Sequence, residues 1–382
     1  MARLGDVFTI SSGGTPNKKE ISFYEHGTIP WVKTGDLKGK YVPDIIECIT
    51  EAGLNNSSAK LFPPNTVLIA MYGATIGACS ILPYEASTNQ ACAAFLPCDN
   101  VLPEYLFYFL SSKKEQFVKD GVGGAQPNIS AGYLKNVEFD IKPIDKQKEV
   151  ICSLNLVDNL ISLRKQQLAK LDELVKSRFV ELFGDPSSNP MGWKETTVGA
   201  ECYYIKDGPH KSLLDVGEGN GYPFISVRNI VNGYIDFSTA KYISEQDYLD
   251  SIKKCHPQKG DMLYSKGGTT GIAKLIDVDV EFANWVHVAV LKFDDTLNGV
   301  FFENMLNCDY CYDQSQRLTK GIANRDLVLS AMAQIKMYKP PLELQKKFAT
   351  FVEQADKSKL AVQRSLDKLE TLKKALMQKY FG

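Results

Sequence analysis

The sequence predicts an α+β protein in which two β-rich domains, related by a pseudo-twofold axis, are joined by two long antiparallel coiled-coil helices. Three observations lead to this fold: a repeat along the whole chain, a heptad pattern that closes each copy, and β-rich segments that precede each heptad pattern. We expect a first domain at 1–142, a first long helix at 143–184, a linker at 185–193, a second domain at 194–339 and a second long helix at 340–382.

The repeat is clearest at the end of each copy. LAKLDELVKSRFVELFG at 168–184 recurs as LDKLETLKKALMQKYFG at 366–382, with a constant offset of 198 residues. Upstream the match is weaker but keeps its order, with IPWVKTGDL (29–37) against YPFISVRNI (222–230) and VLIAMYGATIG (67–77) against DMLYSKGGTTG (261–271). The chain is therefore two tandem copies, each a variable β-rich part followed by a helix.

Apolar residues at alternating steps of four and three predict a helical seam in each copy. The seams comprise Val150, Leu154, Val157, Ile161, Arg164, Leu168, Leu171 and Val175, and then Phe348, Val352, Ala355, Lys359, Val362, Leu366, Leu369 and Lys373. One such helix cannot hide its seam alone, so we expect pairing through Leu154, Val157, Ile161, Leu168, Leu171, Val352, Val362, Leu366 and Leu369.

Two like units usually pack about a twofold axis, which makes the helices antiparallel. The β-rich parts would then lie at opposite ends of a rod of roughly 50 Å, with the chain termini close together. A coiled coil that only oligomerises the protein would also explain the heptads, but it does not explain the duplicated β-rich parts.

Composition narrows the class of protein. The 382 residues carry a net charge of −1, whereas a free-standing, nonspecific DNA binder is usually more basic, so any basic surface here is local. The N-terminus does not resemble a secretory signal, and residues 64–84 read better as two buried strands around a loop than as a membrane span. Nine scattered cysteines suit reduced thiols in a cytoplasmic protein, and one CxxC pair, Cys308 and Cys311, is a weak zinc signal.

The β-rich parts lack the common catalytic motifs. The sequence contains no GxxxxGK[ST], GxSxG or HExxH, and no Asn/Asp-Pro-Pro-aromatic stretch of a base-flipping amino-methyltransferase. With four histidines, general acid–base chemistry would depend on carboxylates. We therefore expect no catalytic, cofactor-binding or metal-binding residues in this chain.

What recurs in both β-rich parts is a set of polar loops with lysine, arginine, amide and glycine residues. Such residues suit DNA, because Lys and Arg contact phosphates, Asn and Gln contact adenine edges, and Arg contacts guanine. Ordinary turns remain the alternative for each loop, and Trp31 and Phe224 within them are expected in the core. The expected DNA contacts are Thr15, Asn17, Lys18, Lys19, Lys33, Thr34, Asp36, Tyr72, Thr75, Gln126, Asn128, Lys206, His210, Lys211, Ser226, Arg228, Asn229, Lys266, Thr269, Thr270, Arg317, Lys320 and Arg325.

These loops and helices together resemble the specificity (S) subunit of type I restriction-modification systems, over essentially the whole chain. The matching loops are GGTP (13–16), IPWVKTGDL (29–37), YGATIG (72–77), TNQA (88–91) and QPNIS (126–130). The helices match through PIDKQ (143–147), PLELQ (341–345) and the endings LFG (182–184) and YFG (380–382). The second copy departs from the pattern, with KDGPHKS at 206–212 and ANWVH at 283–287.

The resemblance implies that each β-rich part is a target recognition domain for one half of a bipartite DNA site, with the helices as a ruler between the halves. It also implies two methyltransferase (modification) subunits with S-adenosylmethionine, and restriction subunits with ATP and Mg. This chain itself would hold no cofactor and contact no membrane. The alternatives are a stand-alone DNA-binding regulator, a coiled-coil scaffold, or an enzyme with an unrecognised carboxylate site.

Overall fold

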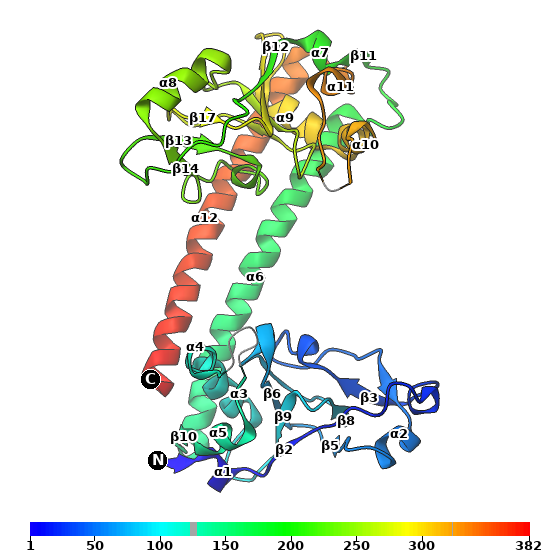
Figure 1. Cartoon of the computed structure of the whole chain (residues 1–382), viewed down its shortest axis with the longest axis vertical. Coiled ribbons are helices and arrows are strands. Elements are labelled where there is room, and N and C mark those ends of the chain that lie inside the picture. The colour runs from blue at the N-terminus through cyan, green and yellow to red at the C-terminus, as the bar shows by residue number, and fades with distance from the viewer. Residues whose placement is uncertain (123–127, 323) are drawn as a thin grey trace. The chain divides into compact units, whose positions relative to one another are not determined.

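The computed structural model describes residues 1–122, 128–322 and 324–382 (Figure 1). The chain forms two compact units. The first unit comprises Met1–Lys165 together with Gln363–Gly382, and the second unit comprises Gln166–Val362. Each unit therefore contains one β-rich part, the start of the helix that follows it, and the end of the other long helix.

Among its described residues the first unit contains two four-stranded sheets and one two-stranded ribbon, with the orders β2-β9-β6-β7, β4-β3-β8-β5 and β1-β10. Its strands are β1 (Ala2–Arg3), β2 (Ile10–Ser12), β3 (Ile29–Val32), β4 (Cys48–Ile49), β5 (Leu61–Phe62), β6 (Val67–Ala70), β7 (Cys79–Ile81), β8 (Ala86–Thr88), β9 (Cys92–Phe95) and β10 (Glu138–Phe139). Its short helices are α1 (Leu4–Val7), α2 (Glu51–Asn55), α3 (Pro103–Ser112), α4 (Lys114–Asp120) and α5 (Ala131–Asn136).

In the part that the structure describes, the second unit repeats this topology, apart from a counterpart of β5, with the orders β12-β18-β15-β16, β14-β13-β17 and β11-β19. Its strands are β11 (Lys194–Thr197), β12 (Cys202–Asp207), β13 (Tyr222–Ile225), β14 (Lys241–Ile243), β15 (Met262–Ser265), β16 (Ala273–Leu275), β17 (Ala283–Asn284), β18 (Val288–Phe293) and β19 (Lys336–Lys339). Its short helices are α7 (Val198–Glu201), α8 (Glu245–Lys254), α9 (Gly299–Asn307), α10 (Asp309–Leu318) and α11 (Leu329–Met332). The matching order of the shared strands confirms the duplication that the sequence predicts.

The two long helices are α6 (Ile144–Phe183) and α12 (Leu342–Phe381). Pro143 and Pro341 stand immediately before them, where a missing N–H leaves no hydrogen bond unmade. Gly184 ends α6 in the left-handed conformation (φ +75°), and its N–H donates to Val180 O at 2.8 Å. Within the described residues, none of the helices is both long and apolar enough to cross a membrane.

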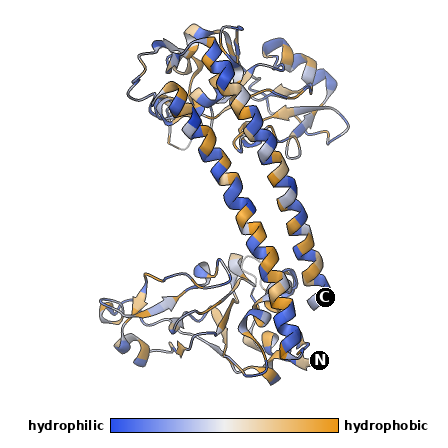
Figure 2. Ribbon diagram, turned by 180° about the vertical axis from the view of Figure 1, so that it is seen from behind, coloured by the Kyte–Doolittle hydropathy of each residue, from blue (hydrophilic) through white to orange (hydrophobic). Residues whose placement is uncertain are grey.

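Burial along the two long helices follows the predicted seam. Each of its sixteen residues is buried or half-buried, while most of their neighbours along α6 and α12 are exposed. Figure 2 shows the hydrophobic residues recurring along both helices. Within the first unit Asp158 meets Lys373 and Lys165 meets Glu370. Within the second unit Asp172 meets Lys359, and Arg178 lies over the Phe351 ring. In each unit the residue number rises along one helix as it falls along the other, so the helices are antiparallel.

The polar residues that interrupt the seam all have partners. Lys359 pairs with Asp172 at 2.8 Å and with Asp356 at 3.3 Å, and Lys373 pairs with Asp158 at 2.6 Å. Arg164 Nε donates to Ser365 Oγ at 3.2 Å. A one-heptad slip would break these contacts, so they favour a single register of the pair.

Aromatic side chains join the helix ends to the core of each unit. In the first unit the Phe381 ring of α12 lies 5.2 Å from Tyr105 and 6.1 Å from Phe109. In the second unit Phe183 of α6 lies 4.9 Å from Phe301. Because β1 pairs with β10 and Phe139 of β10 packs on Phe109, residues near both ends of the chain contribute to the core of the first unit.

A buried glutamine at the start of each long helix holds the helix to its β-rich part. Gln147 is fully buried; its Oε1 accepts from Leu102 N, and its Nε2 donates to Asn100 O and Lys142 O, all at 2.8 Å. In the second unit Gln345 accepts from Asn298 N at 2.8 Å and donates to Pro340 O at 2.7 Å. The Pro-x-x-x-Gln motif thus has a structural role.

Replacing Gln147 with Met keeps the volume but leaves the N–H of Leu102 and two carbonyls unpaired inside the protein. We expect a loss of about 1–3 kcal/mol in the free energy of unfolding, measured by urea denaturation followed by circular dichroism. The control is Gln354→Met on the exposed side of α12, which should change stability little. Equal effects of the two substitutions would contradict the role of Gln147 in holding the helix to its β-rich part.

Candidate nucleic-acid interface

The strand register places four polar loops of the first unit at one edge. Ser12 of β2 and Ala70 of β6 end opposite Ala93 and Cys92, at the start of β9. β3 and β8 run parallel, with Val32 beside Thr88, so both of their carboxyl ends lie together. The loops that leave these ends are 13–16, 33–36, 72–77 and 88–91, which are the loops that the sequence analysis selected.

Hydrogen bonds fix these loops to one another. Gly14 N donates to Thr88 O at 2.9 Å, Trp31 Nε1 donates to Gly14 O at 3.0 Å, and Thr15 Oγ1 donates to Gln90 Oε1. A Cβ on Gly13 would lie 2.0 Å from Thr88 O, so only glycine permits this approach. The GGTP sequence therefore shapes the loop, and Trp31 is a core residue, as expected (2% exposed).

The second unit has the same edge. Asp207 of β12 and Ser265 of β15 end opposite Ala289 and Val288 of β18, and β13 runs parallel to β17 with Ile225 beside Asn284. The loops 206–212, 226–229, 266–271 and 285–287 leave from this edge. A fifth loop joins them, because Gly268 N donates to Arg325 O at 3.0 Å and Leu327 N to Lys266 O at 2.7 Å.

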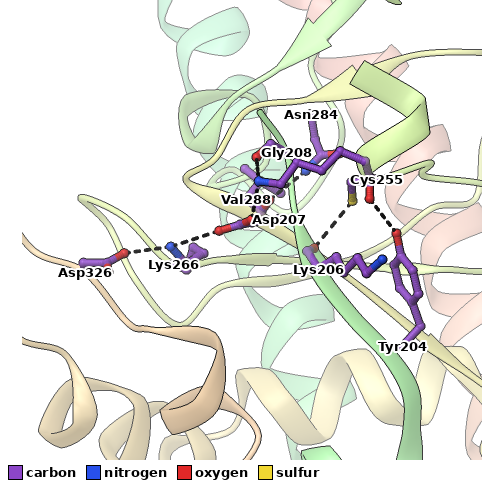
Figure 3. A network of polar contacts seen from close by, with 10 residues as sticks. Tyr204, Lys206, Asp207, Gly208, Cys255, Lys266, Asn284, Val288 and Asp326 are labelled. Carbon is purple, nitrogen blue, oxygen red and sulfur yellow. Dashed lines mark hydrogen bonds and ion pairs between the residues drawn. The ribbon is translucent and has the colours of Figure 1, made fainter. Parts of the chain in front are cut away.

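A buried lysine ties three of these loops together (Figure 3). Lys266 Nζ lies 2.9 Å from Asp326 Oδ1 and 3.5 Å from Asp207 Oδ2, and the Lys266 side chain is 7% exposed. Lys254 completes the group at 2.8 Å from the other oxygen of Asp207. Removing one partner would leave a buried charge uncompensated, so this network holds the loops in place.

Two neutral hydrogen-bond donors, Cys255 and Tyr204, lie next to this network. Burial raises the pKa of Cys255 to about 11 and that of Tyr204 to about 12, so both groups are protonated near neutral pH. Cys255 Sγ donates to Lys206 O at 3.5 Å, and the Tyr204 hydroxyl donates to Lys254 O at 3.2 Å (Figure 3). The main chain at the start of the 206–212 loop is therefore fixed, while the Lys206 side chain is exposed.

Most of the side chains predicted to contact DNA are accessible at these edges. The exposed ones are Asn17, Lys18, Lys19, Tyr72, Asn128, Lys206, His210, Lys211, Arg228, Thr269, Arg317, Lys320 and Arg325, and the half-buried ones are Thr15, Lys33, Thr34, Asp36, Thr75 and Ser226. Gln126 lies outside the described residues. Among the half-buried side chains Lys33 pairs with Glu47, and Asp36 Oδ2 accepts from Lys33 N at 2.8 Å, so both also have partners within the protein.

Three of the predicted contacts lie inside the second unit. Asn229 is 1% exposed, and its Oδ1 accepts from the N–H and hydroxyl of Ser226 while its Nδ2 donates to Asp236 O and Thr239 Oγ1. An asparagine side chain makes about four hydrogen bonds, so none is left for a base. Lys266 is occupied by its two carboxylates.

Thr270 is the third buried residue, at 1% exposure, with its hydroxyl 3.0 Å from Thr319 Oγ1. We therefore correct the interpretation of Asn229, Lys266 and Thr270: they support loops and do not present groups to a ligand. The pattern of residue types was right, but burial within a loop has no periodic signal in the sequence.

The structure also adds residues that the sequence analysis did not select. Lys241 of β14 is exposed and lies next to Phe224 in the register of β13 and β14. Trp285 lines the same cavity as Ser226 and Arg228. The ANWVH segment marked the position of Trp285, but no motif indicated Lys241.

The buried carboxylates do not form a catalytic site. Asp207, Asp261 and Glu303 each pair with lysine, at 2.8 Å to Lys254, 2.5 Å to Lys292 and 3.2 Å to Lys274, respectively. Among the residues that the structure describes, no three His, Cys, Asp or Glu side chains are grouped to hold a metal ion. These pairs lie within the fold, and the exposed loop edges remain the candidate site.

Comparisons with known proteins agree with this geometry. The family model described as type I restriction modification DNA specificity domain matches residues 1–173 and 192–371, once for each copy. The MjaIX specificity subunit of Methanocaldococcus jannaschii is 25% identical, over 99% of this chain and 91% of that protein. The EcoR124I/EcoR124II specificity subunit of Escherichia coli is 26% identical, over 46% of this chain and 45% of that protein.

Solved structures show the same fold. The S subunit of the type I restriction-modification system from M. genitalium superposes with a TM-score of 0.58 at 17% identity, covering 100% of this chain and 95% of that one. A chain from a study of complex assembly in the type I R-M system gives 0.60 at 18% identity, covering 100% and 96%. With both copies matched, this chain belongs to the family of type I restriction-modification specificity subunits, the DNA-recognising and non-catalytic members of these systems.

Proposed function

We propose that each β-rich part reads one half of a bipartite DNA site through its loop edge. The observation that carries this proposal is the repeated edge: the same four strand ends in both units present polar loops whose side chains differ. Lys33, Thr34 and Asp36 follow β3, whereas Ser226 and Arg228 follow β13. Different groups at equivalent positions would read different base pairs, so the half-sites are not identical.

Within the second unit we assign base reading to Arg228. Its side chain is exposed, and Nη2 donates to Thr239 O at 2.7 Å, which orients the guanidinium. A guanidinium can donate two hydrogen bonds to the O6 and N7 of guanine. We assign phosphate contacts to the exposed lysines of the first unit, Lys18 and Lys19, which stand in an irregular loop.

We further propose that two modification subunits bind the paired helices and bring S-adenosylmethionine to an adenine in each half-site, while restriction subunits bring ATP and Mg. Leu174 of α6 and Leu372 of α12 occupy equivalent positions in the repeat, lie off the seam, and are 49% and 46% exposed. Exposed leucines at equivalent places, one in each unit, suit two copies of one partner.

Arg228→Ala should weaken recognition of one half-site by about 1–3 kcal/mol and relax the base preference at one position. Lys18→Ala and Lys19→Ala should instead weaken all DNA sequences alike and lower the salt dependence of binding. The measurement is binding of the reconstituted complex to duplexes in which one half-site at a time is altered. A sequence-independent loss for Arg228→Ala would show that it contacts phosphate only.

The paired helices should set the spacing of the half-sites. Deleting residues 162–168 and 362–368 removes one heptad from each helix and keeps both seams in phase, but shortens each helix by about 10 Å. We expect the preferred gap between half-sites to fall by about three base pairs, or specific binding to be lost because the two readers are also rotated. A deletion variant that binds with the original gap would contradict the proposal that the helices set the spacing of the half-sites.

A further inference from the structure

The β-rich part of the second unit contains a cavity of about 250 Å³ beside its loop edge. It opens between the 206–212 loop, the strands β13 and β14, and the turn after β17. Its wall includes Lys211, Leu213, Phe224, Arg228, Lys241 and Trp285. The volume is below the range of pockets for drug-sized ligands, so it suits a smaller group.

At the corresponding place in the first unit the side chains bond to one another. Trp31 of β3 stands there in place of Phe224, and its N–H is bonded to Gly14 of the tightly apposed GGTP loop. Trp31 N donates to Glu47 O at 2.9 Å, and the Glu47 carboxylate pairs with Lys33. In the second unit KDGPHKS replaces the glycine loop, and the cavity lies beside this segment.

The charged side chains beside Phe224 also differ from those beside Trp31. Lys241 is the neighbour of Phe224 in the strand register, in the place that Glu47 holds beside Trp31. Lys241, Arg228 and Lys211 are all exposed cations at the cavity. Where the first unit has a lysine–glutamate pair, the second unit has like charges, which repel one another unless an anion lies between them.

Two carboxylates lie close enough to affect these cations. Hydrogen bonds from the N–H groups of Tyr242 and Gly217 lower the pKa of Asp215, with Lys241 and Arg228 contributing, so Asp215 is ionised. Asp250 pairs with Lys253 at 2.8 Å. Asp215 lies outside the cavity wall, and Asp250 is already paired. The cavity therefore keeps an excess of positive charge.

The apolar part of the wall is aromatic. Phe224 is 6% exposed, and the Trp285 ring lies 4.5 Å from the His287 ring. The Trp285 Nε1–H is buried and has no hydrogen-bond partner among the described residues. Aromatic rings stack on nucleobases of any sequence, and cations hold the phosphate, so this combination has the chemistry of a nucleotide site.

We propose that this cavity holds one unstacked nucleotide of the DNA target, with its base against Phe224 and Trp285 and its phosphate between Lys211 and Lys241. The inference rests on the proposed function, because the bound DNA supplies the nucleotide. Extruding a base costs stacking and pairing energy, which the ring contacts and the two lysines would offset. The two half-sites would then be read differently: by loops alone in the first unit, and by loops and a pocket in the second.

The first test uses Trp285 as the reporter in the full chain. The emission of Trp285 is obtained by subtracting the spectrum of Trp285→Phe, which retains Trp31 and Trp193, from the spectrum of the wild-type chain. Deoxynucleoside monophosphates should quench this emission saturably, with affinity at least tenfold above that of the matching nucleosides or inorganic phosphate. Lys241→Glu, which introduces the acid of the first unit, should weaken nucleotide binding at least tenfold, while Lys259→Glu, an exposed lysine elsewhere in the second unit, should not. No quenching, or equal binding by Lys241→Glu, would overturn the site.

The second test asks whether DNA is the source of the nucleotide. A duplex with 2-aminopurine placed at each position of the second half-site in turn is bound to the reconstituted complex. One position should gain fluorescence with the wild-type chain and lose that gain with Lys241→Glu. Specific binding without any such position would leave the proposed function standing and overturn the pocket's role in DNA. Failure of the complex to bind any DNA specifically would instead refute the proposed function, and the pocket's role with it.

Discussion

The structure depends on a constraint that neither long helix can satisfy alone: an apolar seam of this length needs a second helix. The chain meets the requirement by duplication, so that α6 and α12 each supply a seam. In each unit the end of one helix packs beside the start of the other. Phe381 completes the aromatic core of the first unit, and Phe183 completes that of the second. The end of each long helix therefore packs into the core of one unit, which explains why the end of the chain repeats its middle.

The buried glutamines connect the paired helices to the β-rich parts. Because Gln147 and Gln345 bond main-chain groups just before α3 and α9, the position of each helix start is fixed relative to the strands. The strands in turn bring their loops to one edge through their register. A reader of DNA needs its contact groups held at set places, and here the hydrogen bonds among the loops supply that rigidity.

Sequence analysis predicted the parts of the molecule that repeat. The heptad steps indicated sixteen positions that are buried or half-buried, and the copy alignment indicated which polar loops recur in both units, because both signals are periodic or duplicated. It was wrong for Asn229, Lys266 and Thr270, whose residue types suit DNA but whose side chains are buried. It also missed Lys241, because the importance of this residue arises from its place beside Phe224 across two strands. Such pairings depend on tertiary structure and leave no local pattern.

The central claim is that two different readers on one chain recognise two different half-sites. The most direct measurement is the map of methylated adenines on genomic DNA treated with this chain and its methyltransferase subunits. The account predicts one motif of two unlike half-sites, separated by a fixed number of unspecified base pairs, with one methylated adenine in each half. A continuous motif, a palindromic motif, or methylation without a fixed gap would contradict it.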